Sequence, residues 1–213
     1  MISISIIGEK MNNNEILKKL ISERPMFHGR ENAGTEQCAI TPDILNWISN
    51  HLKRDSVTLE TGCGHSTVVF MLHSRLHYAI SPFYQEHEVI KKWCKENNIA
   101  TENTKFIASA SQEIIHSLQF DSYLDMVLID GDHAFPAPFI DWYYTADKIK
   151  KGGILIVDDT QLITGNILQE FLLEEKARWV CIEQTRKTAI FKKITSDPVA
   201  KGIPWTQQPY VKK

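Results

Sequence analysis

The sequence lacks the features that mark disulfide-rich, zinc-bound, secreted or membrane-spanning chains. Its four cysteines lie far apart, with no CxxC pair and no zinc-ligand spacing. No apolar run approaches the roughly 20 residues of a membrane span. Residues 1–10 carry no basic region followed by an apolar stretch, so no signal peptide is expected. We therefore expect a reduced, cytoplasmic protein with no membrane partner.

An excess of charge of one sign is missing as well. The formal net charge is -2 at pH 7, from 24 Lys and Arg against 26 Asp and Glu. This balance gives no electrostatic reason to expect nucleic acid as a partner. The content of 43% hydrophobic and 23% charged residues is ordinary for a globular protein, and 213 residues fit one domain. The oligomeric state is not readable from the sequence.

From Ser56 onward, short apolar strands alternate with helices. This alternation predicts right-handed βαβ units and a parallel sheet buried on both faces. The expected strands are 57–60, 77–80, 105–108, 124–129 and 153–157, followed by a hairpin of 179–183 and 188–194. The expected fold is an α/β, Rossmann-like three-layer sandwich. Its seven-stranded sheet is mostly parallel, with an antiparallel C-terminal hairpin strand.

The regular pattern places the main domain at residues 41–194. Residues 1–40 hold a short amphipathic helix, expected at 15–22, and a loop with proline, glycine and several charges. A loop of this length predicts a lid or cap. Residues 195–213 contain three prolines and no periodicity, which predicts an extended C-terminal tail.

The turn after the first strand reads Glu60-Thr61-Gly62-Cys63-Gly64-His65-Ser66. Its two glycines let the backbone turn sharply and approach a ligand without a Cβ in the way. Ser66 opens the next helix, whose free N–H groups can bind a carboxylate. A dinucleotide fingerprint would have glycine where Thr67 stands, and the charge of Glu60 would repel a diphosphate. A tight turn without any ligand is the simpler alternative.

With an acidic residue ahead of its glycines, this turn resembles the first motif of the class I S-adenosylmethionine-dependent methyltransferases. These enzymes usually have an acidic residue after the second strand for the ribose hydroxyls, where this chain has Ser81. The third strand, which ends near the adenine in these enzymes, is followed here by Ser109 and Ser111. The resemblance implies that S-adenosylmethionine is bound by Glu60, Gly62, Cys63, Gly64, Ser66, Ser81, Ser109, Ser111 and Asp130.

Three carboxylates follow the fourth and fifth strands: Asp130, Asp158 and Asp159. Like charges gathered at one edge of the sheet need protons or a cation to compensate them. Oxygen ligands of this kind suit Mg²⁺ or a related ion. Alternatively, these acids only cap loops or organise the cofactor pocket.

The LIDGDH and VDD strand ends resemble those of the metal-dependent O-methyltransferases, in particular the macrocin O-methyltransferase type. The resemblance covers about residues 40–194 and implies that Asp130, Asp158 and Asp159 are metal ligands. His133 follows Asp130 closely and is a candidate general base, with Asp130 as a second catalytic residue. A loop histidine that only hydrogen-bonds a carboxylate is the alternative.

The first hypothesis is therefore an enzyme that methylates the hydroxyl group of a small molecule, with assistance from a divalent metal. A second hypothesis is a methyltransferase without metal. A nucleotide-cofactor oxidoreductase and a non-catalytic or regulatory protein with the same fold are the alternatives from other classes.

Overall fold

The computed structural model of the chain describes residues 11–28, 40–198, 204–208 and 211. In chain order the elements are α1 (Asn13–Glu23), α2 (Pro42–His51), β1 (Val57–Thr61), α3 (His65–His73), β2 (Leu76–Ile80), α4 (Tyr84–Glu96), β3 (Thr104–Ile107), α5 (Ser111–Ile114), η2 (Ile115–Ser117), β4 (Leu124–Ile129), α6 (Ala137–Thr145), β5 (Ile149–Val157), α7 (Ile163–Glu174), β6 (Trp179–Gln184), β7 (Ala189–Lys193) and η3 (Trp205–Gln207).

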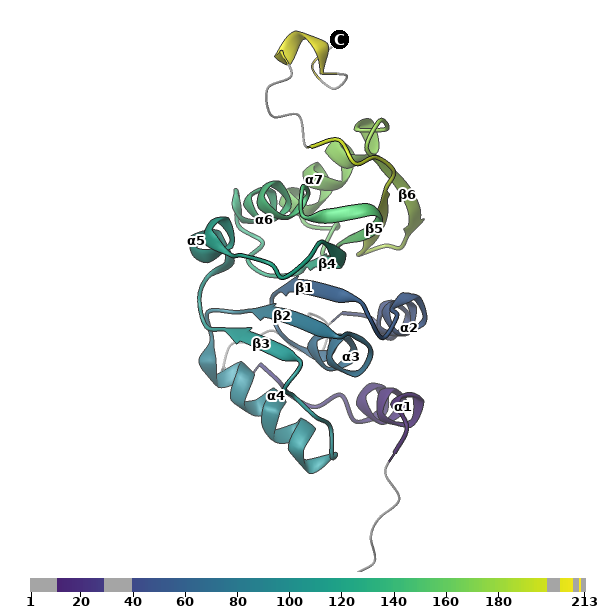
Figure 1. The fold of residues 1–213 in the computed structure, drawn as a ribbon, viewed down its shortest axis with the longest axis vertical. Helices are drawn as coiled ribbons and strands as arrows, with labels where there is room; N and C mark the ends of the chain where they lie inside the picture. Colours follow the sequence, from purple (N-terminus) through teal and green to yellow (C-terminus); the bar gives the residue numbers. More distant parts are fainter. Residues whose placement is uncertain (1–10, 29–39, 199–203, 209–210, 212–213) are drawn as a thin grey trace, which may run out of the picture.

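The strands form one seven-stranded sheet in the order β3-β2-β1-β4-β5-β7-β6. The pairs from β3 to β5 are all parallel, whereas β7 runs antiparallel to both of its neighbours. The predicted Rossmann-like sheet with an antiparallel strand of the C-terminal hairpin is thus confirmed. The order changes direction between β1 and β4, so the loops after these two strands meet (Figure 1).

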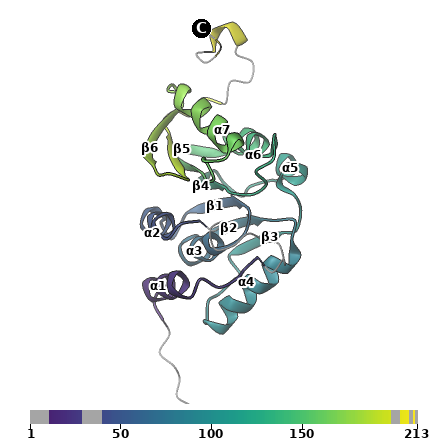
Figure 2. The ribbon, with the colours of Figure 1, turned by 180° about the vertical axis from the view of Figure 1, so that it is seen from behind.

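Two apolar layers enclose the sheet. One layer packs α1, α2, α3 and α4 against the side chains of one sheet face, among them Met126, Leu128 and Ile156. The other packs α6 and α7 against the opposite face, including Val127, Ile129 and Leu155. Figures 1 and 2 show α2 and α3 on one side of the sheet and α5 and α6 on the other. Adjacent residues of β4 therefore face different layers, as expected for a strand buried on both faces.

The structure differs from the sequence prediction around residues 146–152. The strand expected at 153–157 begins earlier, since the helix α6 ends at Thr145 and β5 begins at Ile149. The polar run Lys150-Lys151-Gly152-Gly153 gave no strand signal, because its side chains are mostly exposed. The pairing of β4 with β5 shifts register between Leu124 and Met126. An exposed, irregular strand start of this kind lacks the apolar pattern that identifies buried strands.

The helix expected at 15–22 is present as α1, which begins at Asn13 and is capped by Asn12. The side chain of Asn12 accepts hydrogen bonds from the backbone N–H groups of Asn14 and Glu15. The carboxylate of Glu15 accepts in turn from the backbone N–H of Asn12. Residues 29–39, which form most of the predicted loop, lie outside the described residues, as do 199–203. The division into an N-terminal part, a main domain and a tail remains a prediction. Among the described residues, no helix is both long enough and apolar enough to cross a membrane.

A fully buried carboxylate on α6 generates a stability prediction. Neither oxygen of Asp141 accepts a hydrogen bond of normal geometry from a described residue. Burial raises the pKa of the Asp141 carboxyl from 3.8 to about 6, although the nearby Ser111 and Thr61 hydroxyls lower it in part. The folded state therefore holds this proton more tightly than the unfolded chain does. The resulting stability is complete below pH 3.8 and is lost as the pH rises through about 6.

We expect Asp141→Asn to raise the free energy of unfolding at pH 8 by about 3 kcal/mol, since the variant has no buried charge to form. Urea unfolding at pH 5 and pH 8 measures the effect. The gain should be smaller at pH 5, and Asp55→Asn, at an exposed position, should show no such gain. Equal unfolding free energies for wild type and Asp141→Asn at pH 8 would contradict the prediction.

Candidate functional site

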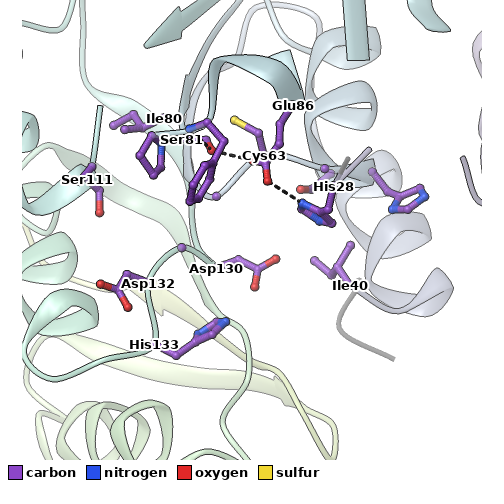
Figure 3. Close-up of a pocket in the computed structure, with 18 of the residues that line it drawn as sticks. His28, Ile40, Cys63, Ile80, Ser81, Glu86, Ser111, Asp130, Asp132 and His133 are labelled. Atoms are coloured by element: carbon purple, nitrogen blue, oxygen red, sulfur yellow. Dashed lines mark hydrogen bonds and ion pairs between the residues drawn. The ribbon is translucent and has the colours of Figure 1, made fainter. Parts of the chain in front are cut away.

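A pocket of about 500 Å³ lies at the carboxyl ends of β1, β2 and β4. This is the edge at which open α/β sheets bind ligands, next to the point where the strand order reverses. Figure 3 shows His28 and Glu86 at one side of the pocket and Asp130, Asp132 and His133 at another. The lining residues are His28, Ile40, Gly62–Ser66, Ile80–Phe83, Glu86, Ala110–Gln112 and Asp130–His133.

The glycine turn forms the floor of this pocket and is held tightly by the backbone around it. Gly62 has a φ of +86°, and its N–H donates to the Ile80 carbonyl at 2.8 Å. A Cβ at this position would lie 2.1 Å from the backbone oxygen of Asp130. Gly64 has an extended φ of −174°, and its N–H donates to the Thr67 hydroxyl at 2.9 Å. Gly62 is therefore required by its close contact with the backbone of Asp130.

Of the nine residues predicted to bind the cofactor, seven line the pocket: Gly62, Cys63, Gly64, Ser66, Ser81, Ser111 and Asp130. Glu60 and Ser109 are not among the lining residues. Glu60 is fully buried behind the turn, where its carboxylate accepts hydrogen bonds from Ser66 at 2.6 Å and His77 at 3.1 Å. Ser109 donates to the backbone oxygen of Ala110 at 3.4 Å. Burial raises the pKa of the Cys63 thiol well above its usual value, so this cysteine stays a neutral thiol.

Among the pocket residues that the sequence did not predict, Glu86 and His28 form a pair. Glu86, on the first turn of α4, is only 2% exposed and accepts a hydrogen bond from Ser81 at 2.7 Å. Its other oxygen lies 3.1 Å from Nδ1 of His28, which precedes the main domain. The adjacent Phe27 is fully buried against His65 and Trp93. No motif links residues 28 and 86 in the sequence, so only the folded chain brings them together.

The predicted acidic cluster lies at the ends of β4 and β5. Asp130, His133 and Asp159 each offer one ligand atom, and these atoms lie within 4.8 Å of one another. Nε2 of His133 is 3.0 Å from an Asp159 oxygen. The other Asp159 oxygen accepts from Gln161 at 2.5 Å and lies 3.6 Å from Nζ of Lys187. The lysine thus brings a positive charge close to Asp159, and the histidine brings a hydrogen-bond donor.

Each acid in this cluster has a different environment. Burial and the charges of Asp158 and Asp159 raise the pKa of Asp130 well above its usual value. Burial also raises the pKa of Asp159, but hydrogen bonds from His133 and Gln161 outweigh it and lower that pKa to about 2. The hydrogen bond to Asp159 raises the pKa of His133. Asp159 is therefore the acid that stays ionised, and Asp130 is the one that tends to hold a proton.

Asp158 lies outside the group of three candidate ligand atoms. One of its oxygens accepts a hydrogen bond from the Thr188 hydroxyl on the β6–β7 turn. The other is buried without a hydrogen-bond partner among the described residues. Burial raises the pKa of this carboxyl. In the structure, the three candidate metal ligands that lie close together are thus Asp130, Asp159 and His133, whereas the sequence predicted Asp158 as the third.

Comparisons with known proteins bear on the domain and the fold of this chain. A family model described as a methyltransferase domain matches residues 59–160. The O-methyltransferase TomG from Streptomyces achromogenes, solved with SAM, superposes with a TM-score of 0.64 at 12% identity, over 83% of this chain and 90% of that chain. A Streptococcus mutans protein assigned as a methyltransferase, solved with SAH, gives 0.58 at 13% identity, over 73% and 100%.

The rRNA methylase from Streptococcus thermophilus is also similar, with a TM-score of 0.56 at 14% identity, over 72% of this chain and 95% of that chain. At such low identities these likenesses establish the fold. No match to a curated protein sequence was found.

The two glycines of the turn give a prediction with a built-in control. We expect Gly62→Ala to lower the free energy of unfolding by about 2–5 kcal/mol, because the new methyl group overlaps the Asp130 carbonyl at a positive φ. Gly64→Ala should change it by less than about 1 kcal/mol, since its Cβ would lie an ordinary 3.5 Å from His28. Urea unfolding of both variants measures the difference. Similar losses in the two variants would refute this account of the turn.

Proposed function

We propose that this chain is an S-adenosylmethionine-dependent methyltransferase that methylates an oxygen atom of a small hydroxylated molecule; the methyltransferase-domain match over residues 59–160 and the shared fold support this. The observation that carries the proposal is the His133–Asp159 pair, 3.0 Å apart, at the rim of the pocket that holds the glycine turn. A base in this position suits a hydroxyl nucleophile, which becomes reactive when its proton is removed. The domain match argues against the oxidoreductase alternative.

The charges around the pocket suit a sulfonium cofactor. Glu86, Asp130 and Asp132 line it, and none of its described lining residues is lysine or arginine. A cationic ligand is favoured in such an environment, whereas a diphosphate is repelled. The free N–H groups at the start of α3, beside Gly64 and Ser66, would bind the carboxylate of the cofactor. Cys63, which lines the pocket as a neutral thiol, would contribute packing.

Glu86 supplies the carboxylate that is missing from the end of β2. It lies next to Ser81, which holds it by a hydrogen bond, and it lines the same pocket. We assign Glu86 as the acceptor for the ribose hydroxyls and Ser111 as a contact on the adenine side. His28, bonded to Glu86, closes the pocket from the N-terminal side.

The reaction needs an oxygen lone pair aligned with the methyl carbon and opposite the sulfur. S-adenosylmethionine would supply the methyl group, and the carbon–sulfur electron pair would stay on sulfur as the acceptor oxygen displaces it. His133 takes the hydroxyl proton. Since Nε2 of His133 is bound to Asp159, the proton transfer would use Nδ1. Asp159 orients the ring and stabilises the imidazolium that forms.

Asp130, His133 and Asp159 together also fit a divalent metal as ligands. The neighbouring Asp158 has one buried oxygen without a hydrogen-bond partner among the described residues. A nitrogen ligand favours an ion such as Mn²⁺ over Mg²⁺. When bound, such an ion would lower the pKa of the acceptor hydroxyl. An anionic nucleic acid is a poor match to these acids, so a small-molecule acceptor remains the prediction.

Chelation separates the two routes to an activated hydroxyl. If His133 acts as base without a metal, methyl transfer from S-adenosylmethionine to a panel of phenols and sugar alcohols should persist in EDTA. If the metal is required, activity should fall to background in EDTA and return on adding Mn²⁺ or Mg²⁺. Asp159→Ala, which removes one of the three candidate ligands, should then weaken metal binding while cofactor binding survives. Calorimetry with Mn²⁺ and with S-adenosylmethionine measures both.

Replacing the base gives a test of its role. We expect His133→Gln to lower kcat by about 10²-fold or more, the range for loss of general base catalysis. Its affinity for S-adenosylmethionine should change little, because the substitution keeps the size of the side chain. His116→Gln, at an exposed histidine, is the matched control and should retain full activity. An unchanged kcat in His133→Gln would refute the assignment of the base.

A further inference from the structure

A chain of hydrogen bonds runs through the sheet behind the glycine turn. The Thr58 hydroxyl is 2.9 Å from the Ser74 hydroxyl and 2.9 Å from Nδ1 of His77. Nε2 of His77 is 3.1 Å from one oxygen of Glu60, and Ser66 donates to the other at 2.6 Å. The five side chains come from β1, β2 and α3 with its C-cap. Together they connect the two central strands to the helix that begins at the turn.

This chain of polar groups is embedded in an apolar layer. Thr58, Glu60 and His77 are all 0% exposed. His77 pairs in register with Thr58 across β1 and β2, and its ring stacks on Phe70 with the centroids 4.8 Å apart. A charged group buried so deeply is costly unless it is fully hydrogen-bonded. An apolar pair at these two strand positions would stabilise the core more simply, so the polar pair calls for another reason.

One arrangement of protons satisfies every member of the chain. A carboxylate only accepts hydrogen bonds, so Nε2–H of His77 and the hydroxyl of Ser66 both donate to Glu60. Nδ1 of His77 then accepts from Thr58, whose oxygen accepts in turn from Ser74. With a neutral imidazole, both carboxylate oxygens and both ring nitrogens are paired. The orientation of Glu60 therefore depends on His77.

Glu60 connects the two ends of the glycine turn, one through its backbone and the other through its side chain. Its backbone lies in β1 immediately before Thr61 and Gly62, while its side chain holds Ser66 on the first turn of α3. Ser66 lines the pocket, whereas Glu60 and His77 do not. The pair thus acts on the pocket only through the shape of the turn.

We propose that His77 and Glu60 are a buried positioning pair that holds residues 61–66 in the shape that binds the cofactor, without touching it. The inference rests on the proposed cofactor site but not on the identity of the methyl acceptor. It also moves Glu60 from the predicted cofactor contacts to a supporting role. His77 becomes a functional residue through its bond to Glu60.

The test uses His77→Phe, which keeps an aromatic ring for stacking on Phe70 but leaves one oxygen of Glu60 without a donor. Without any ligand, the amides of residues 61–66 should exchange with deuterium about tenfold faster or more, while those of β4 and β5 stay protected. The affinity for S-adenosylmethionine in calorimetry should fall about tenfold, as for loss of a hydrogen bond to a charged group. His77→Gln, whose amide can donate to Glu60, should restore most of both values.

His73→Phe is the matched control. It removes one histidine hydrogen bond, to Ser49, at the C-terminal end of α3, far from the glycine turn. It should leave both exchange in the turn and cofactor affinity unchanged. If His77→Phe does not fold, Thr58→Val removes the donor to His77 conservatively and should speed exchange in the turn. Unchanged exchange in the turn of a folded variant would overturn the proposal, as would equal losses in His77→Phe, His77→Gln and His73→Phe.

The exchange measurement separates this proposal from the proposed function. Faster exchange without binding of S-adenosylmethionine to the wild type would support the pair and reject the cofactor. If the wild type binds S-adenosylmethionine but exchange in the turn of His77→Phe is unchanged, the cofactor is supported and the positioning pair is rejected.

Discussion

The site depends on the close contact between the backbone of Gly62 and the carbonyl of Asp130. Because β1 and β4 are neighbours, the loops after them meet. The space between them is small, since a Cβ at Gly62 would lie only 2.1 Å from the carbonyl oxygen of Asp130. The same contact brings the glycine turn beside the loop that carries Asp130 and His133. The glycine turn and the loop with Asp130 and His133 are therefore placed by one packing constraint, and a side chain at residue 62 would disturb both.

The sheet and its elements followed from the sequence because parallel strands buried on both faces leave a strong apolar signal, as in Met126–Ile129. The turn followed from its two glycines. Glu86 and His28 did not, because pocket residues that come from a helix turn and from a distant segment leave no periodic pattern. The start of β5 was not predicted either, because an exposed segment of lysine and glycine has the composition of a loop.

The acids of the site illustrate how burial divides roles among similar residues. Asp159 has hydrogen-bond donors on both oxygens and is ionised, whereas Asp130, beside two other acids, holds a raised pKa. Sequence alone places all three aspartates at one edge of the sheet, but it cannot tell which of them receive donors. Those donors come from His133, from Gln161 and from the β6–β7 turn, where Lys187 and Thr188 contact the acids.

The methyltransferase match covers residues 59–160, but the site extends beyond it at both ends. Phe27 is buried in the layer formed by α1 to α4, and this fixes the neighbouring His28 at the pocket, against Glu86. On the other side, Lys187 and Thr188 belong to the hairpin that follows α7. The N-terminal segment and the C-terminal hairpin thus supply groups that the central domain lacks. His28 lines the pocket itself, whereas Lys187 and Thr188 act on the aspartates that follow β5.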